Sequence, residues 1–136
     1  MQNLAYAAAP IVGYLSAGIL KFMINSIRAR RLAFGQIGLG GMPSTHTTIV
    51  TSAAALTAFR AGIATPVFSL AVAVMMIVII DAMDLRRKVG QHASALRRLM
   101  PGGSKMELRE RMGHSPIEVL VGVVLGILIG AVLAKW

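Results

Sequence analysis

Cysteine is absent from this 136-residue sequence, acidic residues number only five, and aromatic residues make up 5%. Without cysteine, disulfide bonds and thiolate metal sites are excluded. Fourteen Lys and Arg residues leave a formal net charge of +9, which is common among proteins that bind nucleic acid. Because aromatic side chains are few and apolar runs are long, we expect membrane lipids as partners and no nucleic acid.

Hydrophobic residues, by contrast, make up 56% of the chain and gather in long runs. A hydrocarbon core about 30 Å thick needs roughly 20 helical residues to cross it. The runs predict an all-α fold in which residues 1–136 form one membrane domain, a polytopic bundle of about four transmembrane helices. The expected spans are residues 4–24, 47–63, 66–83 and 116–134. The second span is short and rich in Ser and Thr, so we expect its polar face to be buried against its neighbours.

The basic connection formed by residues 85–115 has its own helical pattern. Its regularly spaced apolar residues are Val89, Ala93, Leu96 and Met100. This spacing predicts an amphipathic helix that lies at the membrane interface. We expect Arg97, Arg98 and Lys105 to do no more than touch anionic lipid headgroups.

Positive charge is unequally distributed between the two faces that four spans define. The connections 25–46 and 85–115 share one face and hold most of the Lys and Arg residues. The other face, with both termini and the turn near residues 60–65, has only Arg60 and Lys135. The positive-inside rule therefore places the two long connections in the cytoplasm.

Three glycines, Gly122, Gly126 and Gly130, recur at intervals of four in the last span. This spacing puts small residues along one helical face, where another helix can approach closely. The partner helix belongs either to the same chain or to a second copy, so a homodimer through this face is one of two alternatives.

Two polar stretches stand where apolar helices are expected to begin. In the first, Ser44 or Thr45 can cap a helix whose first turn contains His46. In the second, Ser115 is followed three positions later by Glu118, which is the pattern of a capping box. Each stretch therefore marks the N-terminus of a helix on the same predicted face of the membrane.

Histidines accompany both of these helix starts, His46 in the first and His114 in the second. Helix N-termini favour a bound anion, and nearby arginines supply planar donors for phosphate oxygens. The pattern predicts a phosphate site, although a single histidine here is more often a satisfied interfacial group and Glu118 more often only a capping partner. His92 has no comparable setting, and three scattered histidines do not form a zinc site, so we expect no metal.

Three elements occur in order along the chain: Lys21 with Arg28, the run from Pro43 to His46, and His114 with Glu118. They resemble the three signatures of the type 2 phosphatidic acid phosphatase superfamily, which includes vanadium haloperoxidases. More narrowly, the chain resembles a divergent branch of small bacterial and plastid membrane proteins. That closer resemblance lies in Gly41–His46, in Asp81-Ala82 with Arg86-Arg87 and Gly90, and in His114–Val119.

The resemblance implies a metal-independent lipid phosphate phosphatase that works through a phosphohistidine and needs no cofactor. By the same resemblance, His114 would be the nucleophile, Glu118 would orient it, and His46 would act as general acid and then as general base. It also implies an integral protein of the bacterial inner (plasma) membrane, with a lipid phosphate as substrate. The charge distribution would put its site on the cytoplasmic side.

The resemblance also assigns the groups that would bind the phosphate. The expected phosphate-binding residues are Lys21, Arg28, Ser44, Thr45, Arg86 and Arg87. In the superfamily an arginine usually stands six positions before the nucleophilic histidine, but this chain has Leu108 there. Arg86 or Arg87 would replace that arginine, and Asp81 would pair with one of them. A charge such as Asp81 inside a membrane helix is costly and is more often functional than idle.

Two other functions remain open from the sequence. The chain could be a protein that binds or transports a lipid phosphate without cleaving it, which the departure at Leu108 favours. It could also be a small structural membrane protein organised by its glycine face. The nature of the lipid tail cannot be predicted, because apolar helices accommodate any hydrocarbon.

Overall fold

The structure, a computed structural model, describes residues 4–30, 41–100, 108–110 and 112–136. Within these residues the fold is all-α, as the apolar runs predicted. The elements are α1 (Leu4–Ala29), α2 (Thr45–Ala61), α3 (Pro66–Ile80), the π-helical turn η2 (Asp81–Leu85), α4 (Arg86–Leu99) and α5 (Pro116–Ala134). The four expected spans correspond to α1, α2, α3 and α5, and α1 ends at residue 29, beyond the predicted residue 24.

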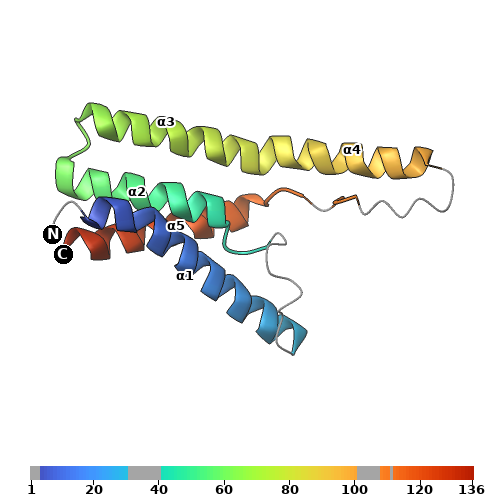
Figure 1. The fold of residues 1–136 in the computed structure, drawn as a ribbon, viewed down its shortest axis with the longest axis horizontal. Helices are drawn as coiled ribbons and strands as arrows, with labels where there is room; N and C mark the ends of the chain where they lie inside the picture. Colours follow the sequence, from blue (N-terminus) through green and yellow to red (C-terminus); the bar gives the residue numbers. More distant parts are fainter. Residues whose placement is uncertain (1–3, 31–40, 101–107, 111) are drawn as a thin grey trace.

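Helix α2 lies at the centre of the arrangement (Figure 1). It packs most extensively on α5, which runs parallel to it, and also on α1 and α3, which run antiparallel. The start of α1, the end of α5 and the turn from α2 to α3 lie together at what we call the termini end. The N-termini of α2 and α5 lie at the opposite end, here called the polar end. The expected division of the connections between two faces therefore agrees with the fold.

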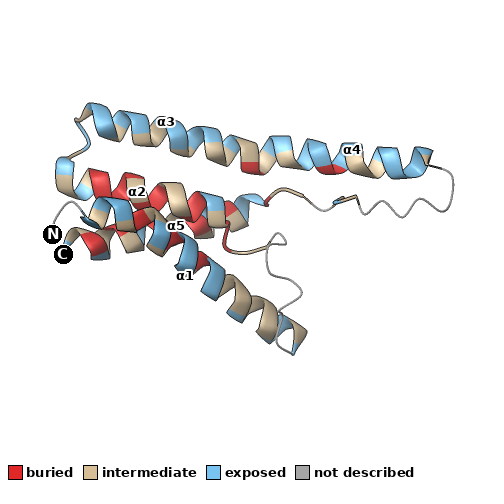
Figure 2. Ribbon diagram, in the orientation of Figure 1, coloured by how far each residue is buried: buried red, intermediate tan, exposed pale blue. Residues whose placement is uncertain are grey.

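The hydroxyl-bearing face of α2 is buried, and buried residues concentrate on this helix (Figure 2). Its fully buried Ser and Thr residues are Ser44, Thr47, Thr48 and Ser52. The Oγ of Ser52 lies 3.0 Å from the carbonyl oxygen of Ala9 in α1 and 2.8 Å from that of Ile49. Because buried hydroxyls are tolerated when they have such partners, a helix this polar can sit inside an apolar bundle.

The glycine face of α5 packs against α2 of the same chain. Gly122, Gly126 and Gly130 are all buried. A Cβ atom at Gly126 would lie 2.6 Å from Cβ of Thr51, and one at Gly130 would lie 2.6 Å from Cβ of Ala55. The first of the two sequence-based alternatives therefore describes this face. Within this chain α2 covers the face, and the homodimer that formed the second alternative stays a prediction.

Helices α3 and α4 form one continuous helical stretch from Pro66 to Leu99, 34 residues long (Figure 1). At 1.5 Å per residue it measures about 51 Å, more than a hydrocarbon core requires. The predicted amphipathic helix is present as α4, but it continues the axis of α3 and does not begin separately. The π-helical turn η2 joins the two, with the N–H of Arg86 bonded to the carbonyl of Asp81, five residues back.

Three helical stretches of the described chain are long and apolar enough to cross a membrane. They are Leu4–Ala29, Pro66–Leu99 and Pro116–Ala134. Helix α2 has 17 residues and falls outside this group. It is enclosed by the three others, which fits the expectation that the second span is buried against its neighbours.

Candidate active site

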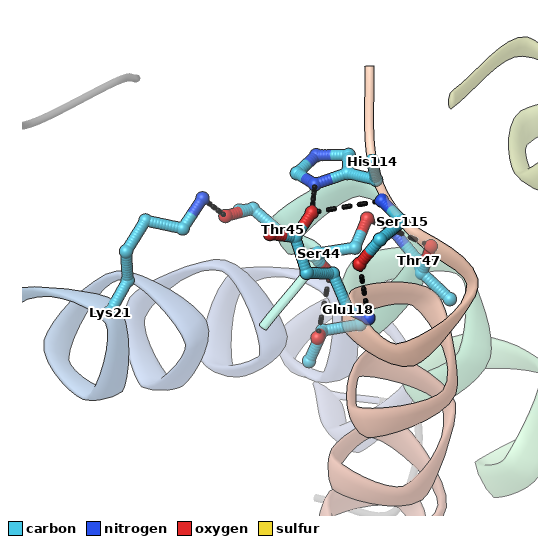
Figure 3. A network of polar contacts seen from close by, with 8 residues as sticks. Lys21, Ser44, Thr45, Thr47, His114, Ser115 and Glu118 are labelled. Atoms are coloured by element: carbon cyan, nitrogen blue, oxygen red, sulfur yellow. Dashed lines mark hydrogen bonds and ion pairs between the residues drawn. The ribbon is translucent and has the colours of Figure 1, made fainter. Parts of the chain in front are cut away.

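A histidine just before α5 and a carboxylate in its first turn are in direct contact. Ser115 is the N-cap, and its Oγ accepts the N–H of Glu118 at 3.3 Å. Oε2 of Glu118 accepts the N–H of Ser115 at 3.0 Å, which confirms the predicted capping box. The same oxygen lies 3.0 Å from Nδ1 of His114 (Figure 3). Glu118 therefore caps the helix and holds the histidine ring with one oxygen atom.

This contact determines which nitrogen of His114 can react. An ionised carboxylate only accepts hydrogen bonds, so Nδ1 must carry the proton that bonds to Glu118. The lone pair of the neutral ring then resides on Nε2. His114 is only 8% exposed, so its ring is fixed by its surroundings as well as by the carboxylate.

The N-terminus of α2 meets the N-terminus of α5 directly. Ser44 is the N-cap of α2, and its Oγ accepts the hydroxyl of Thr47 at 2.9 Å. Its own N–H donates to the carbonyl oxygen of Glu118 at 3.0 Å. His46, two residues further along, is close enough to His114 for their charges to interact. The two histidines therefore share one end of the bundle, as the sequence predicted.

Two cationic side chains, one from α1 and one from α4, reach the polar end. Nζ of Lys21, on α1, donates to Oγ1 of Thr45 at 3.2 Å (Figure 3). On the other side, Nη2 of Arg86 lies 3.5 Å from Nε2 of His46. Nε of Arg86 donates to Oδ2 of Asp81 at 2.9 Å, so Arg86 is the arginine that Asp81 pairs with.

Two other expected phosphate-binding residues lie differently. Arg28 is exposed in the last turn of α1, about two turns beyond Lys21. Arg87 packs the stem of its side chain beside Gly113, where a Cβ atom would lie 2.7 Å from Cγ of Arg87. Gly113 has a φ of 92°, which favours glycine, so the chain can make this close approach just before His114.

The backbone of His114 is fixed by a residue that the sequence analysis did not assign to the site. Its N–H donates to the carbonyl oxygen of Ala82 at 2.9 Å. Ala82 is 0% exposed and belongs to the π-helical turn η2. Turns of this kind interrupt the regular i to i−4 bonding and occur often at functional sites. The Asp81-Ala82 pair marked this place in the sequence, but nothing indicated a carbonyl as the contact.

The electrostatic surroundings of His46 favour its neutral form. Partial burial of the ring lowers the pKa of His46 below the usual value for histidine, although part of the residue remains exposed. The positive charge of Arg86 lowers this pKa further, and Asp81 acts in the opposite direction. Near neutral pH the ring is therefore mainly uncharged.

His92, which the sequence left without a role, is exposed on α4. Among the residues that the structure describes, no three His, Asp or Glu side chains gather in a way that could hold a metal ion.

The apolar helices and the paired helix N-termini define an integral membrane protein with a polar site at one end of its bundle. Its sequence matches the Divergent PAP2 family over residues 2–129, and the chain belongs to this family. It is also similar to a Bacillus subtilis (strain 168) protein described as "Uncharacterized membrane protein YuiD". The two are 30% identical over 142 aligned residues, which cover 91% of this chain and 90% of that protein. No solved structure matches the chain.

Proposed function

We propose that this protein is an integral membrane phosphatase that hydrolyses a phosphomonoester or diphosphate of a lipid. One observation carries the proposal: the His114–Glu118 pair at the N-terminus of α5 shares the polar end with His46 on α2, with Lys21 and Arg86 nearby. This is the set of groups that phosphoryl transfer through a histidine requires, namely a nucleophile, an acid and base, and cations. Membership of the Divergent PAP2 family supports the proposal.

In the first step, the Nε2 lone pair of His114 attacks phosphorus and a P–N bond forms. The bond from phosphorus to the leaving oxygen breaks, and His46 gives that oxygen a proton. Glu118 stabilises the positive charge that develops on the ring of His114, as carboxylates beside catalytic histidines commonly do. The lipid product leaves as an alcohol, or as a phosphate where the substrate is a diphosphate.

In the second step, water cleaves the phosphohistidine. His46, now neutral, takes a proton from the water as its oxygen attacks phosphorus. The P–N bond breaks, its electron pair returns to Nε2 of His114, and inorganic phosphate is released. No metal or other cofactor takes part in either step.

The phosphate oxygens carry negative charge throughout, and the transition state needs that charge stabilised. Lys21 and Arg86 supply cations from opposite sides, and Ser44 and Thr45 supply polar groups at the N-terminus of α2. The helix N-terminus itself favours the anion. Arg28 and Arg87 complete the proposed phosphate-binding set.

The placement of the protein in the cell is part of the proposal. We infer a single domain in a bacterial inner membrane, with the polar end on the cytoplasmic side. The distribution of Lys and Arg between the two ends supports this orientation. Phosphatidic acid, phosphatidylglycerophosphate and polyprenyl diphosphates are all substrates of the right chemistry.

The test is phosphate release from the detergent-solubilised protein over a panel of lipid phosphates, with a chelator present. We expect release by the wild type, release at background level by His114→Ala, and full release by His92→Ala. Full turnover by His114→Ala would show that the nucleophile is a different group.

A second candidate function is binding or transport of the same headgroup without cleavage. Leu108 favours it, because an apolar residue stands where the superfamily usually has a phosphate-binding arginine. In that case the wild type would bind lipid phosphates, and move them between leaflets of a vesicle, without releasing phosphate.

A further inference from the structure

The residues described between α4 and α5, 108–110 and 112–115, lie along α4 and η2, and we call them the return segment. Its contacts show that it runs antiparallel to α4. They pair His114 with Ala82, Gly113 with Arg87, and Glu110 with Gly90, Ser94 and Arg97.

The contact furthest from the site is made by the carboxylate of Glu110. Oγ of Ser94 donates to its Oε2 at 2.7 Å, and the guanidinium of Arg97 pairs with its Oε1. Arg97, which we expected only to touch lipid headgroups, is therefore a partner of the return segment. Gly90 is buried and lies against the backbone of Glu110. The approach is so close that a Cβ atom at Gly90 would collide with the backbone oxygen of Glu110.

The contact nearest the site is the bond from the N–H of His114 to Ala82. The return segment is thus held at two levels of one helix, with four residues from the carboxylate contact to the histidine. Four residues span at most about 14 Å, so the carboxylate contact lies only a short length of chain from His114.

We propose that Glu110 is a positioning residue for the phosphatase reaction, which fixes His114 by fastening the return segment to α4. The inference rests on the proposed function for its effect on turnover. Glu110 acts through the backbone and does not touch the substrate. Since a displacement of about 1 Å can cost about 10²-fold in rate, a small slip of the return segment is enough to slow attack by His114.

A purely structural role for the same contact predicts a different result. Partly exposed ion pairs contribute little to stability, and the side chain of Arg97 is 60% exposed. If the contact did no more than this, its loss would change stability slightly and leave kcat unchanged in the folded protein.

The experiment compares Glu110→Ala with the matched control Lys88→Ala. Lys88 also forms an ion pair on this helix, at 3.0 Å from Asp84, but both members belong to the α3–α4 stretch. We expect Glu110→Ala to lower kcat about 10-fold while KM changes less than about twofold. Lys88→Ala should keep both values. Exchanging the two charges, with Arg97→Glu and Glu110→Arg together, should restore much of the kcat that Arg97→Glu alone loses.

Hydrogen exchange at the backbone N–H of His114 gives a measurement that does not need turnover. Glu110→Ala should make it faster, while Lys88→Ala and the amides of α2 keep the wild-type rates. Unchanged exchange in Glu110→Ala would overturn the proposal, and so would faster exchange with an unchanged kcat. If the wild type releases no phosphate from any lipid, the proposed function fails, and the exchange rates alone decide whether Glu110 holds His114 in place.

Discussion

The two ends of the bundle each contain an arginine, and the surroundings of these two residues differ. At the termini end, Arg60 donates from Nη2 to the carbonyl of Leu133 at 2.9 Å and from Nε to that of Ala134 at 3.4 Å. Its guanidinium also lies 5.8 Å from the centre of the Tyr6 ring. At the polar end, Arg86 contacts the Asp81 carboxylate and reaches His46 only at 3.5 Å.

The difference follows from the direction of the helices. Because α2 and α5 are parallel, their N-termini share the polar end and their C-termini share the termini end. C-terminal carbonyls attract a cation, so Arg60 is bound by the protein itself. N-terminal amides attract an anion, and the cations near them contact side chains: Arg86 pairs with Asp81, and Lys21 donates to Thr45. Parallel packing of two helices thus gives the two ends of the bundle opposite electrostatic character.

The largest expected effect is at the polar end. Glu118→Gln keeps the size of the side chain but removes the charge that holds the proton on Nδ1 of His114. We expect kcat to fall by about 10²- to 10⁴-fold, as happens when the carboxylate beside a catalytic histidine is neutralised. Phosphate release by the purified variant measures this. Wild-type turnover would mean that Glu118 is only a helix cap.

The second largest effect is expected from matched substitutions of two glycines on α5, one near each end of the bundle. A Cβ at Gly122 would lie 2.8 Å from the carbonyl oxygen of Ser44, and one at Gly130 would lie 2.8 Å from the N of Leu56. Gly122→Ala and Gly130→Ala should each lower the free energy of unfolding by about 1–3 kcal/mol through overpacking. Only Gly122→Ala should also lower kcat, because it displaces the cap beside the histidines. Thermal unfolding in detergent and kcat per folded molecule separate the two effects, and an equal loss of kcat in both variants would contradict the comparison.

The smallest expected effect is a shift of the pH profile, and the two arginines are compared for it. Burial and, next, the charge of Arg86 lower the pKa of His46, and a general acid works only while it is protonated. The kcat/KM of the wild type should therefore fall as pH rises through this lowered pKa. Arg86→Gln removes a positive charge, raises the pKa of His46 and moves the fall to higher pH.

Arg60→Gln is the control for that shift at the other end of the molecule. It should keep the wild-type pH profile and lose about 1–2 kcal/mol of stability, because carbonyls at the end of α5 lose a charged donor. A profile that moves in both variants would show that the shift is not caused by the local charge of Arg86.

The parts of the fold that could be predicted are those encoded by neighbouring residues. The places of the apolar helices followed from apolar runs, and the cap at Ser115 followed from Glu118 three positions later, because both depend on residues one or two turns apart. The placement of His46 and His114 at one end of the bundle could be predicted as well, since alternating spans put both helix starts on one face. The catalytic and phosphate-binding roles of these residues remain predictions.

What could not be predicted depends on tertiary contacts. The carbonyl of Ala82 has no signal in the sequence, because every residue has one and only the fold brings this one to His114. The pairing of Arg97 with Glu110 could not be predicted either, because the sequence offers each of them several partners of opposite charge. The continuation of α3 into α4 also escaped prediction, since the charged residues after Ile80 are typical of a membrane boundary but do not end a helix.

The enclosure of α2 has a consequence for how the protein is made. Helix α2 leaves the ribosome before α5, yet α5 is the neighbour that covers most of its buried hydroxyl face. Until α5 has been synthesised, the Thr and Ser side chains of this face can contact only α1, α3 and the backbone of α2 itself. The buried face of α2 is therefore covered only once α5, the last helix, has been made. A chain whose synthesis stops before residue 116 leaves α2 in the membrane without its main packing partner.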